Sequence, residues 1–167
     1  MRKTLHITLL FFMMLLTGAA NAETVTFDFT GESAYGMTLL SGSTQDYNPD
    51  PTVCTEGSVT LTLNGRSRWW KASKGNELRC YSGTTFTVSV PNGVITKVEL
   101  TATTPSNFTA NGYSNGVWEG SASSVDFACT ITKSNTPISK IVVTYSASSA
   151  TKKAAKALLA RVLLTRA

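Results

Sequence analysis

Apolar and polar residues alternate along most of the chain, in short runs that are separated by turn residues. Because successive side chains of a β-strand point to opposite faces, this alternation predicts strands with one buried face and one exposed face. Asn64-Gly65 and Pro91-Asn92-Gly93 are typical of the turns between such strands. The predicted core-facing residues are Val25, Phe27, Phe29, Val59, Leu61, Leu63, Phe86, Val88, Val90, Val94, Val98, Leu100, Val125, Phe127, Cys129, Ile131, Ile141, Val143 and Tyr145.

The number and spacing of these runs indicate the class of fold. Several short, half-buried strands favour a β-sandwich or a jelly roll over a closed barrel. The stretch 23–150 is long enough for a single two-layer core. We therefore expect an all-β protein with one antiparallel, jelly-roll-like β-sandwich domain at 23–150.

The first 22 residues have the pattern of a secretory signal peptide. Arg2 and Lys3 precede an apolar run over residues 5–16, and Ala20-Asn21-Ala22 ends the segment with small residues. The apolar run is too short for a stable membrane-spanning helix. We expect cleavage after Ala22, no transmembrane segment in the mature chain, and a secreted or cell-envelope location.

The positive charge of the chain lies mainly at its two ends. Lys and Arg number 15 against 10 acidic residues, but residues 23–150 hold 8 basic and 10 acidic ones, a net charge of −2. A body with a slight excess of acids does not favour nucleic-acid binding. Residues 151–167 change abruptly to Ala, Leu, Lys and Arg with amphipathic helical spacing. We interpret them as a short, basic, helical tail, and contact of this tail with an anionic membrane is the alternative.

Residue types that serve common catalytic and metal sites are scarce outside the leader. The one histidine is His6, so the body has no Ser-His-Asp or Cys-His set and no imidazole for a metal. We therefore expect no enzyme activity, no metal and no cofactor. The enzymatic alternative is a glycosidase that uses Glu119 and Asp126, which would need the two carboxylates within about 5 to 10 Å of each other in a cleft.

Two adjacent tryptophans, Trp69 and Trp70, are the most informative candidates for a binding site. In an extended strand only one of the two rings can enter the core, and the other must lie at the surface. An exposed indole beside guanidinium groups suits stacking on a sugar ring with hydrogen bonds to its hydroxyls. The alternatives are a cation–π surface without any ligand and, least favoured, stacking on single-stranded nucleic acid. The predicted ligand-binding residues are Trp69, Trp70, Arg66, Arg68 and Tyr81.

Trp118, Cys129 and Cys80 are interpreted as core residues, and Cys54 lies at the end of a loop that contains two prolines. Glycines on both sides of Trp118 let its large ring close one end of a core. Cys129 lies on the predicted core face, and Cys80 alternates with Leu78. Export permits a disulfide, and Cys54 with Cys80 is the pairing we favour, although spacing does not decide the connectivity.

Five short phrases, which fall mainly on the predicted strands, form a recognisable set. They are Leu78-Arg79-Cys80-Tyr81, Gly83-Thr84-Thr85-Phe86-Thr87-Val88, Gly93-Val94-Ile95-Thr96-Lys97-Val98, Gly116-Val117-Trp118-Glu119-Gly120 and Ile138-Ser139-Lys140-Ile141-Val142-Val143-Thr144-Tyr145. Together they resemble a group of secreted β-sandwich modules from surface proteins of gut anaerobic bacteria. The resemblance covers roughly residues 24–145 and implies a jelly-roll-like module, usually non-catalytic, that is carried beside other domains.

Taken together, the patterns favour a secreted, non-catalytic binding or adhesion module. Its expected partner is a glycan or another cell-surface component, which the tryptophan and arginine residues would contact. A purely structural module of a cell envelope, with no small ligand, is the first alternative. The glycosidase described above is the second.

Overall fold

The computed structural model describes residues 22–31, 35–42 and 46–147. This part of the chain is built mainly of strands, and its one helical segment is the short 3-10 turn Pro105–Asn107. The strands are β1 (Ala22–Asp28), β2 (Leu39–Leu40), β3 (Thr52–Glu56), β4 (Val59–Asn64), β5 (Ser67–Ala72), β6 (Gly75–Tyr81), β7 (Thr85–Ser89), β8 (Gly93–Ala102), β9 (Phe108–Thr109), β10 (Tyr113–Ser114), β11 (Val117–Ala122), β12 (Ser124–Cys129) and β13 (Asn135–Ala147).

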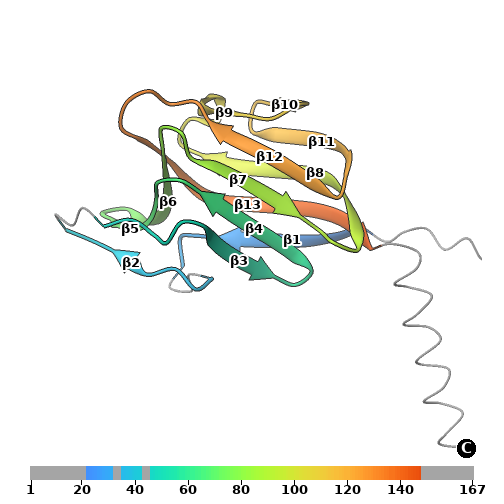
Figure 1. The fold of residues 1–167 in the computed structure, drawn as a ribbon, viewed down its shortest axis with the longest axis horizontal. Coiled ribbons are helices and arrows are strands. Elements are labelled where there is room, and N and C mark those ends of the chain that lie inside the picture. Colours follow the sequence, from blue (N-terminus) through green and yellow to red (C-terminus); the bar gives the residue numbers. More distant parts are fainter. Residues whose placement is uncertain (1–21, 32–34, 43–45, 148–167) are drawn as a thin grey trace, which may run out of the picture.

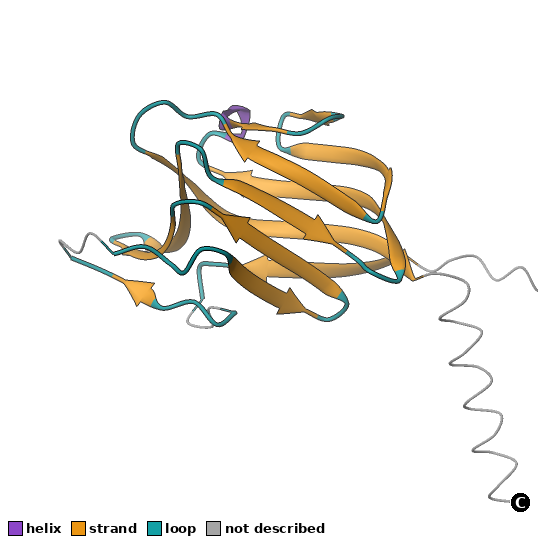
Figure 2. Ribbon diagram, in the orientation of Figure 1, coloured by secondary structure: helices purple, strands orange, loops and turns teal. Residues whose placement is uncertain are grey.

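The strands form two sheets that pack face to face (Figure 1), and the loops gather around the ends of the strands (Figure 2). Sheet A has the order β10-β11-β8-β13-β6-β5-β2, with β1 paired to β13 beside this path, and sheet B has the order β3-β4-β7-β12-β9. The pairings are antiparallel except for the two-residue parallel pairing of β2 with β5. The structure therefore confirms the predicted all-β, antiparallel sandwich.

The core lies between the inner faces of the two sheets. Phe27 and Phe29 enter it from the β1 side, and Phe86 and Phe127 enter it from sheet B. The rings of Phe86 and Phe127 are stacked, with centroids 4.8 Å apart and an interplanar angle of 12°. Period-two alternation produces this arrangement because it places every second side chain of a strand in the same apolar layer.

One of the predicted core positions is wrong. Val94 is 36% exposed, and its neighbour Ile95 is buried instead. The cause is a β-bulge, because Lys97 pairs with Thr144 and Ile95 pairs with Tyr145, which leaves one extra residue on β8. A bulge of this kind shifts the alternation by one residue, and the sequence pattern alone does not reveal where that happens.

Trp118 closes one end of the core, as predicted. Its ring is buried, and its Nε1 donates a hydrogen bond to the carbonyl oxygen of Asn111 at 2.7 Å. The ring lies against the backbone of Gly120, where an added Cβ would be 2.6 Å from Cζ2 of the indole. Glycine at this position therefore permits the close approach of the ring.

The start of β1 and the end of β13 lie side by side. β1 pairs antiparallel with β13 from Ala22 opposite Ser146 to Asp28 opposite Lys140. The predicted leader up to Asn21 and the predicted tail at 151–167 fall outside the described residues. In the described part of the chain, no helix is long and apolar enough to cross a membrane.

Candidate ligand-binding site

The two adjacent tryptophans leave β5 on opposite faces of sheet A. Trp69 is 3% exposed in the core, and its Nε1 donates a hydrogen bond to the carbonyl oxygen of Phe29 at 2.9 Å. Trp70 lies on the outer face and is half-buried. The prediction that only one ring enters the core is confirmed, and Trp69 is no part of the outer surface.

Two arginine side chains contact the ring of Trp70. Antiparallel pairing places Arg68 of β5 opposite Arg79 of β6, and Trp70 opposite Glu77. The Cζ atom of Arg79 lies 4.7 Å from the centroid of the Trp70 ring, and the Cζ atom of Arg68 lies 5.7 Å from it. At such distances the electron-rich face of an aromatic ring attracts a guanidinium group. This attraction opposes the repulsion between two like charges that face each other across a strand pair.

Tyr47, in the loop before β3, extends this arrangement. The Cζ atoms of Arg68 and Arg66 lie 4.3 Å and 5.8 Å from the centroid of its ring. Tyr81 contacts both Tyr47 and Arg68. The centroid of its ring lies 5.4 Å from the centroid of the Tyr47 ring and 5.4 Å from Cζ of Arg68. Rings and guanidinium groups thus alternate across the outer face. We call this surface the arginine–aromatic patch: Tyr47, Arg66, Arg68, Trp70, Arg79 and Tyr81.

Positive charge in the patch is only partly balanced. Oε1 of Glu77 accepts a hydrogen bond from Nε of Arg79 at 2.7 Å. Arg68 is 8% exposed, and its buried Nε has no hydrogen-bond partner among the residues that the structure describes. Within the described part of the chain, neither Arg66 nor Arg68 forms an ion pair with an acidic side chain. The patch therefore has free capacity to bind an acceptor group.

Two members of the patch, Tyr47 and Arg79, were not in the predicted set. Tyr47 lies about twenty residues before Trp69, and it is held over β5 because the backbone N–H of Asn48 donates to the carbonyl oxygen of Ser67 at 2.9 Å. Nothing in the sequence signals this long-range contact. Arg79 could have been found, because a tight turn at Ser73-Lys74 places it opposite Arg68.

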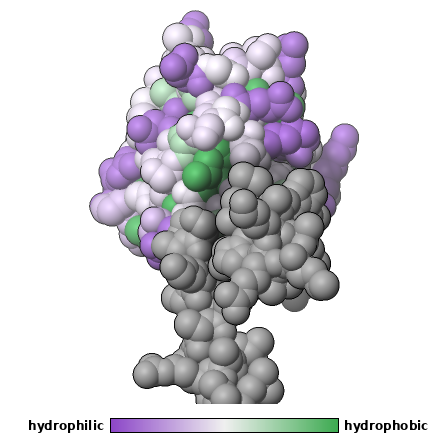
Figure 3. Space-filling model, turned by 90° about the vertical axis from the view of Figure 1, so that its right-hand side faces the viewer, coloured by the Kyte–Doolittle hydropathy of each residue, from purple (hydrophilic) through white to green (hydrophobic). Residues whose placement is uncertain are grey.

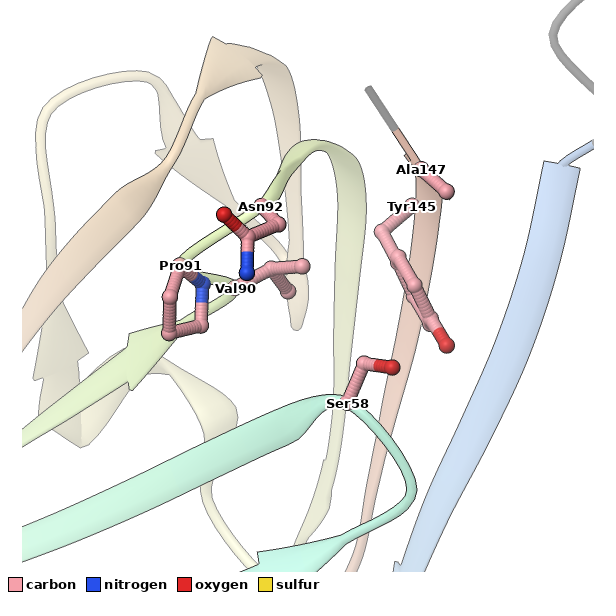
Figure 4. A pocket seen from close by; sticks show the side chains of 6 residues that line it. All are labelled: Ser58, Val90, Pro91, Asn92, Tyr145 and Ala147. Carbon is pink, nitrogen blue, oxygen red and sulfur yellow. The ribbon is translucent and has the colours of Figure 1, made fainter. Parts of the chain in front are cut away.

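A hollow of about 270 Å³ lies far from the patch, at the end of the sandwich where β13 ends (Figure 4). Figure 3 shows this end of the molecule, where a small hydrophobic area lies beside residues of intermediate and hydrophilic character. Tyr145 is the one titratable side chain in the lining, and burial together with a hydrogen bond to Glu23 raises its pKa. The lining residues of the hollow are Ser58, Val90, Pro91, Asn92, Tyr145 and Ala147.

Glu119 and Asp126, the carboxylates of the glycosidase alternative, do not lie together. Glu119 is exposed on β11 of sheet A, and Asp126 is exposed on β12 of sheet B, where it accepts a hydrogen bond from Oγ1 of Thr87 at 2.6 Å. Their strand neighbours Trp118 and Phe127 point into the core, so the two carboxylates point outward from opposite faces. Because packed sheets are about 10 Å apart, the carboxylates are too far from each other to act on one glycosidic bond. That pairing is wrong.

The favoured disulfide pairing is also wrong. Sγ of Cys129 lies 3.9 Å from the carbonyl oxygen of Cys80, so these two cysteines are neighbours in the core. Cys54 lies on β3, which two strands separate from β12 and Cys129 in sheet B. The spacing between β3 and β12 is roughly 14 Å, against a limit of about 7 Å between the Cα atoms of a disulfide, and Cys80 lies beside Cys129 rather than beside Cys54. All three thiols are free and buried.

Among the described residues, no three His, Cys, Asp or Glu side chains gather where they could hold a metal ion. Comparison of the chain with protein-family models, curated proteins and solved structures finds no match. The arginine–aromatic patch is therefore the candidate ligand-binding site. The patch brings together four of the five predicted residues, namely Arg66, Arg68, Trp70 and Tyr81.

Proposed function

We propose that the chain is a secreted, non-catalytic binding or adhesion module that contacts carbohydrate through the arginine–aromatic patch. The observation that carries this proposal is the alternation of aromatic rings with guanidinium groups on the outer face of β5 and β6. A sugar ring has an apolar face that can stack on an aromatic side chain, and its hydroxyls accept hydrogen bonds from guanidinium groups. Both kinds of contact are offered within one surface.

Exposure of the patch supports the same proposal. Tyr47 is 37% exposed, and Trp70 is half-buried, so both rings keep accessible surface. Their contacts with arginine also restrict the orientations of the two rings. A ring that is already ordered loses little conformational entropy when a ligand stacks on it. The patch is therefore preorganised for stacking.

The leader pattern and the fold agree with a module that works outside the cell. Residues 1–22 predict export, and the resemblance to bacterial surface modules implies the same location. We propose that the sandwich is of the jelly-roll kind. Support comes from the path of the chain, which passes from sheet B to sheet A between β4 and β5 and back to sheet B between β6 and β7.

A glycan array with the full chain tests this proposal. Trp70→Ala and Tyr47→Ala should each weaken glycan binding by about tenfold, which corresponds to about 1.4 kcal/mol. Tyr47→Phe keeps the ring and should bind like the unchanged chain, and Val94→Ala at the opposite end is a surface control. If no glycan binds, or if neither alanine variant changes the binding, the proposal is wrong.

A structural module of a cell envelope is the second candidate, and the edge of sheet B favours it. Within the described ranges, β3 pairs with β4 on one side only, and Val53 on this strand is 55% exposed. An open strand edge is a template for pairing with another chain. Replacement of Thr55 by Pro would block such pairing. If this candidate holds, the replacement should abolish self-association in light scattering of the concentrated chain and leave glycan binding unchanged.

A further inference from the structure

We infer that the ligand of the arginine–aromatic patch carries an anionic group, a sulfate ester or a carboxylate of an acidic glycan, and that Arg66 and Arg68 hold it. This inference rests on the proposed function of the same patch. Its chemistry is that of a planar guanidinium group, whose two N–H edges match the oxygens of a carboxylate or a sulfate.

Arg68 carries the first part of the argument. Its side chain is more than nine-tenths buried, and the buried Nε finds no hydrogen-bond acceptor among the described residues. A buried donor without an acceptor is unfavourable, and native proteins rarely leave one without a reason. The three rings around this guanidinium group attract its charge but accept no conventional hydrogen bond at Nε. A ligand oxygen would satisfy the donor.

The local charge of the patch is the second reason to expect an anionic ligand. The patch holds three guanidinium groups, and among the described residues the ion pair that they form is that of Arg79 with Glu77. Arg66 and Arg68 bring their positive charges together on a body, 23–150, whose net charge is −2. Because Glu77 is engaged by Arg79, it is not the partner of Arg66 or Arg68. Those two residues are the anion-binding pair.

The arrangement also shows how a ligand would reach the pair. Arg66 is exposed, so it offers the first contact. Tyr47 lies over both guanidinium groups, and a tilt of its ring would open the Nε edge of Arg68. The same ring would then stack on the sugar that carries the anionic group. One ligand would thus carry its anionic group next to the sugar ring that stacks on Tyr47.

Three dextrans of equal length test the inference: neutral dextran, carboxymethyl-dextran and dextran sulfate, titrated calorimetrically into the full chain at about 0.15 M salt to screen long-range attraction. The test variant is Arg66→Gln/Arg68→Gln. The matched control is Lys71→Gln/Lys74→Gln, which removes the same charge from the same strand pair outside the patch. Arg68→Lys keeps the charge but loses the planar fork. Arg66→Gln alone leaves the buried arginine in place, so it keeps the test valid if the variants of Arg68 fail to fold.

We expect at least one anionic dextran to bind about tenfold more tightly than neutral dextran, and the arginine variant to lose about tenfold while the lysine control loses less than about threefold. The derivative that binds identifies the group as sulfate or carboxylate. Equal losses in the two double variants would mean general charge attraction and would overturn the inference. Equal binding of all three dextrans, or neutral hits alone on the glycan array, would overturn it and leave the proposed function standing. If nothing binds in either assay, both are overturned.

Discussion

Arg68 and Arg79 lie directly opposite each other on β5 and β6, and both guanidinium groups contact the ring of Trp70. Two like charges in this position repel each other unless something between or beside them compensates. The indole ring and the carboxylate of Glu77 provide that compensation. The stability of the strand pair and the binding capacity of the patch therefore depend on the same side chains, and variants are needed that separate the two.

Trp70→Ala should destabilise the fold as well as weaken binding. The change removes the attraction of the ring for two guanidinium groups and leaves their repulsion, so we expect a loss of about 1 to 2 kcal/mol in the free energy of unfolding. Urea denaturation followed by circular dichroism measures it. Trp70→Phe retains an aromatic face and should recover part of the loss, and equal stability of the alanine variant and the unchanged chain would contradict this role.

Trp69→Phe should lower the stability of the fold and leave glycan binding unchanged. The indole N–H of Trp69 is the hydrogen-bond donor to the carbonyl oxygen of Phe29, and phenylalanine cannot replace it. A buried carbonyl without a partner lowers the free energy of unfolding by about 1 to 3 kcal/mol. Because Trp69 faces the core, glycan binding by the folded variant should not change. A selective loss of binding at unchanged stability would show that Trp69, contrary to its burial, contacts the ligand.

Gly120→Ala should destabilise the end of the core that Trp118 closes. The new Cβ would lie 2.6 Å from Cζ2 and 2.8 Å from Cη2 of the indole, which is closer than any ordinary contact. Shifting the ring out of its position should lower the free energy of unfolding by about 1 to 3 kcal/mol. The neighbouring change Ser121→Ala, at an exposed position, serves as the control in thermal unfolding. Equal melting temperatures for the two variants would count against the close packing of the ring.

Asp28 should make the free energy of unfolding depend on pH in the acidic range, because its pKa in the folded chain lies below the usual value of a carboxylate. Hydrogen bonds from Thr30, and then the contact with Lys140, lower the pKa of Asp28 from 3.8 to about 2. Since the folded pKa is the lower one, the stabilising contribution is complete above the unfolded pKa and disappears as the pH falls toward the folded pKa. The side chain is exposed enough for solvent screening, so we expect less than about 1 kcal/mol. Urea denaturation should show a smaller difference between about pH 5 and pH 2.5 for Asp28→Asn.

The cysteines should be unreactive in the folded chain. Burial raises the pKa of Cys54 to about 11, and burial also raises the pKa of Cys80 and of Cys129. A protonated, buried thiol is a poor nucleophile at neutral pH. An aromatic disulfide reagent should therefore detect no rapid thiol in the native protein and three in denaturant. Peptide mapping after exposure to oxidised glutathione should never yield a Cys54–Cys80 link.

The alternation of apolar residues was sufficient to predict the class of fold and most of the core, because a half-buried strand repeats every two residues. It failed at Val94, where a bulge inserts one residue and the alternation shifts. In the patch, the sequence grouped Arg66, Arg68 and Trp70 because they are close neighbours in the chain, on β5 or directly before it. It missed Tyr47, whose position depends on a backbone contact with a strand twenty residues further along the chain. The favoured pairing of Cys54 with Cys80 was wrong because the two cysteines lie on different sheets, on β3 of sheet B and β6 of sheet A, and their separation along the chain does not reveal this.

The pairing of Ala22 with Ser146 means that the two ends of the described chain leave the sandwich at one pole. Figure 1 shows β5 and β6 at the opposite pole. A tether or a neighbouring module joined at either end would therefore lie far from β5 and β6, which carry most of the arginine–aromatic patch. Because both chain ends lie at the other end of the domain, several such domains could be joined in series without covering the patch of any one of them.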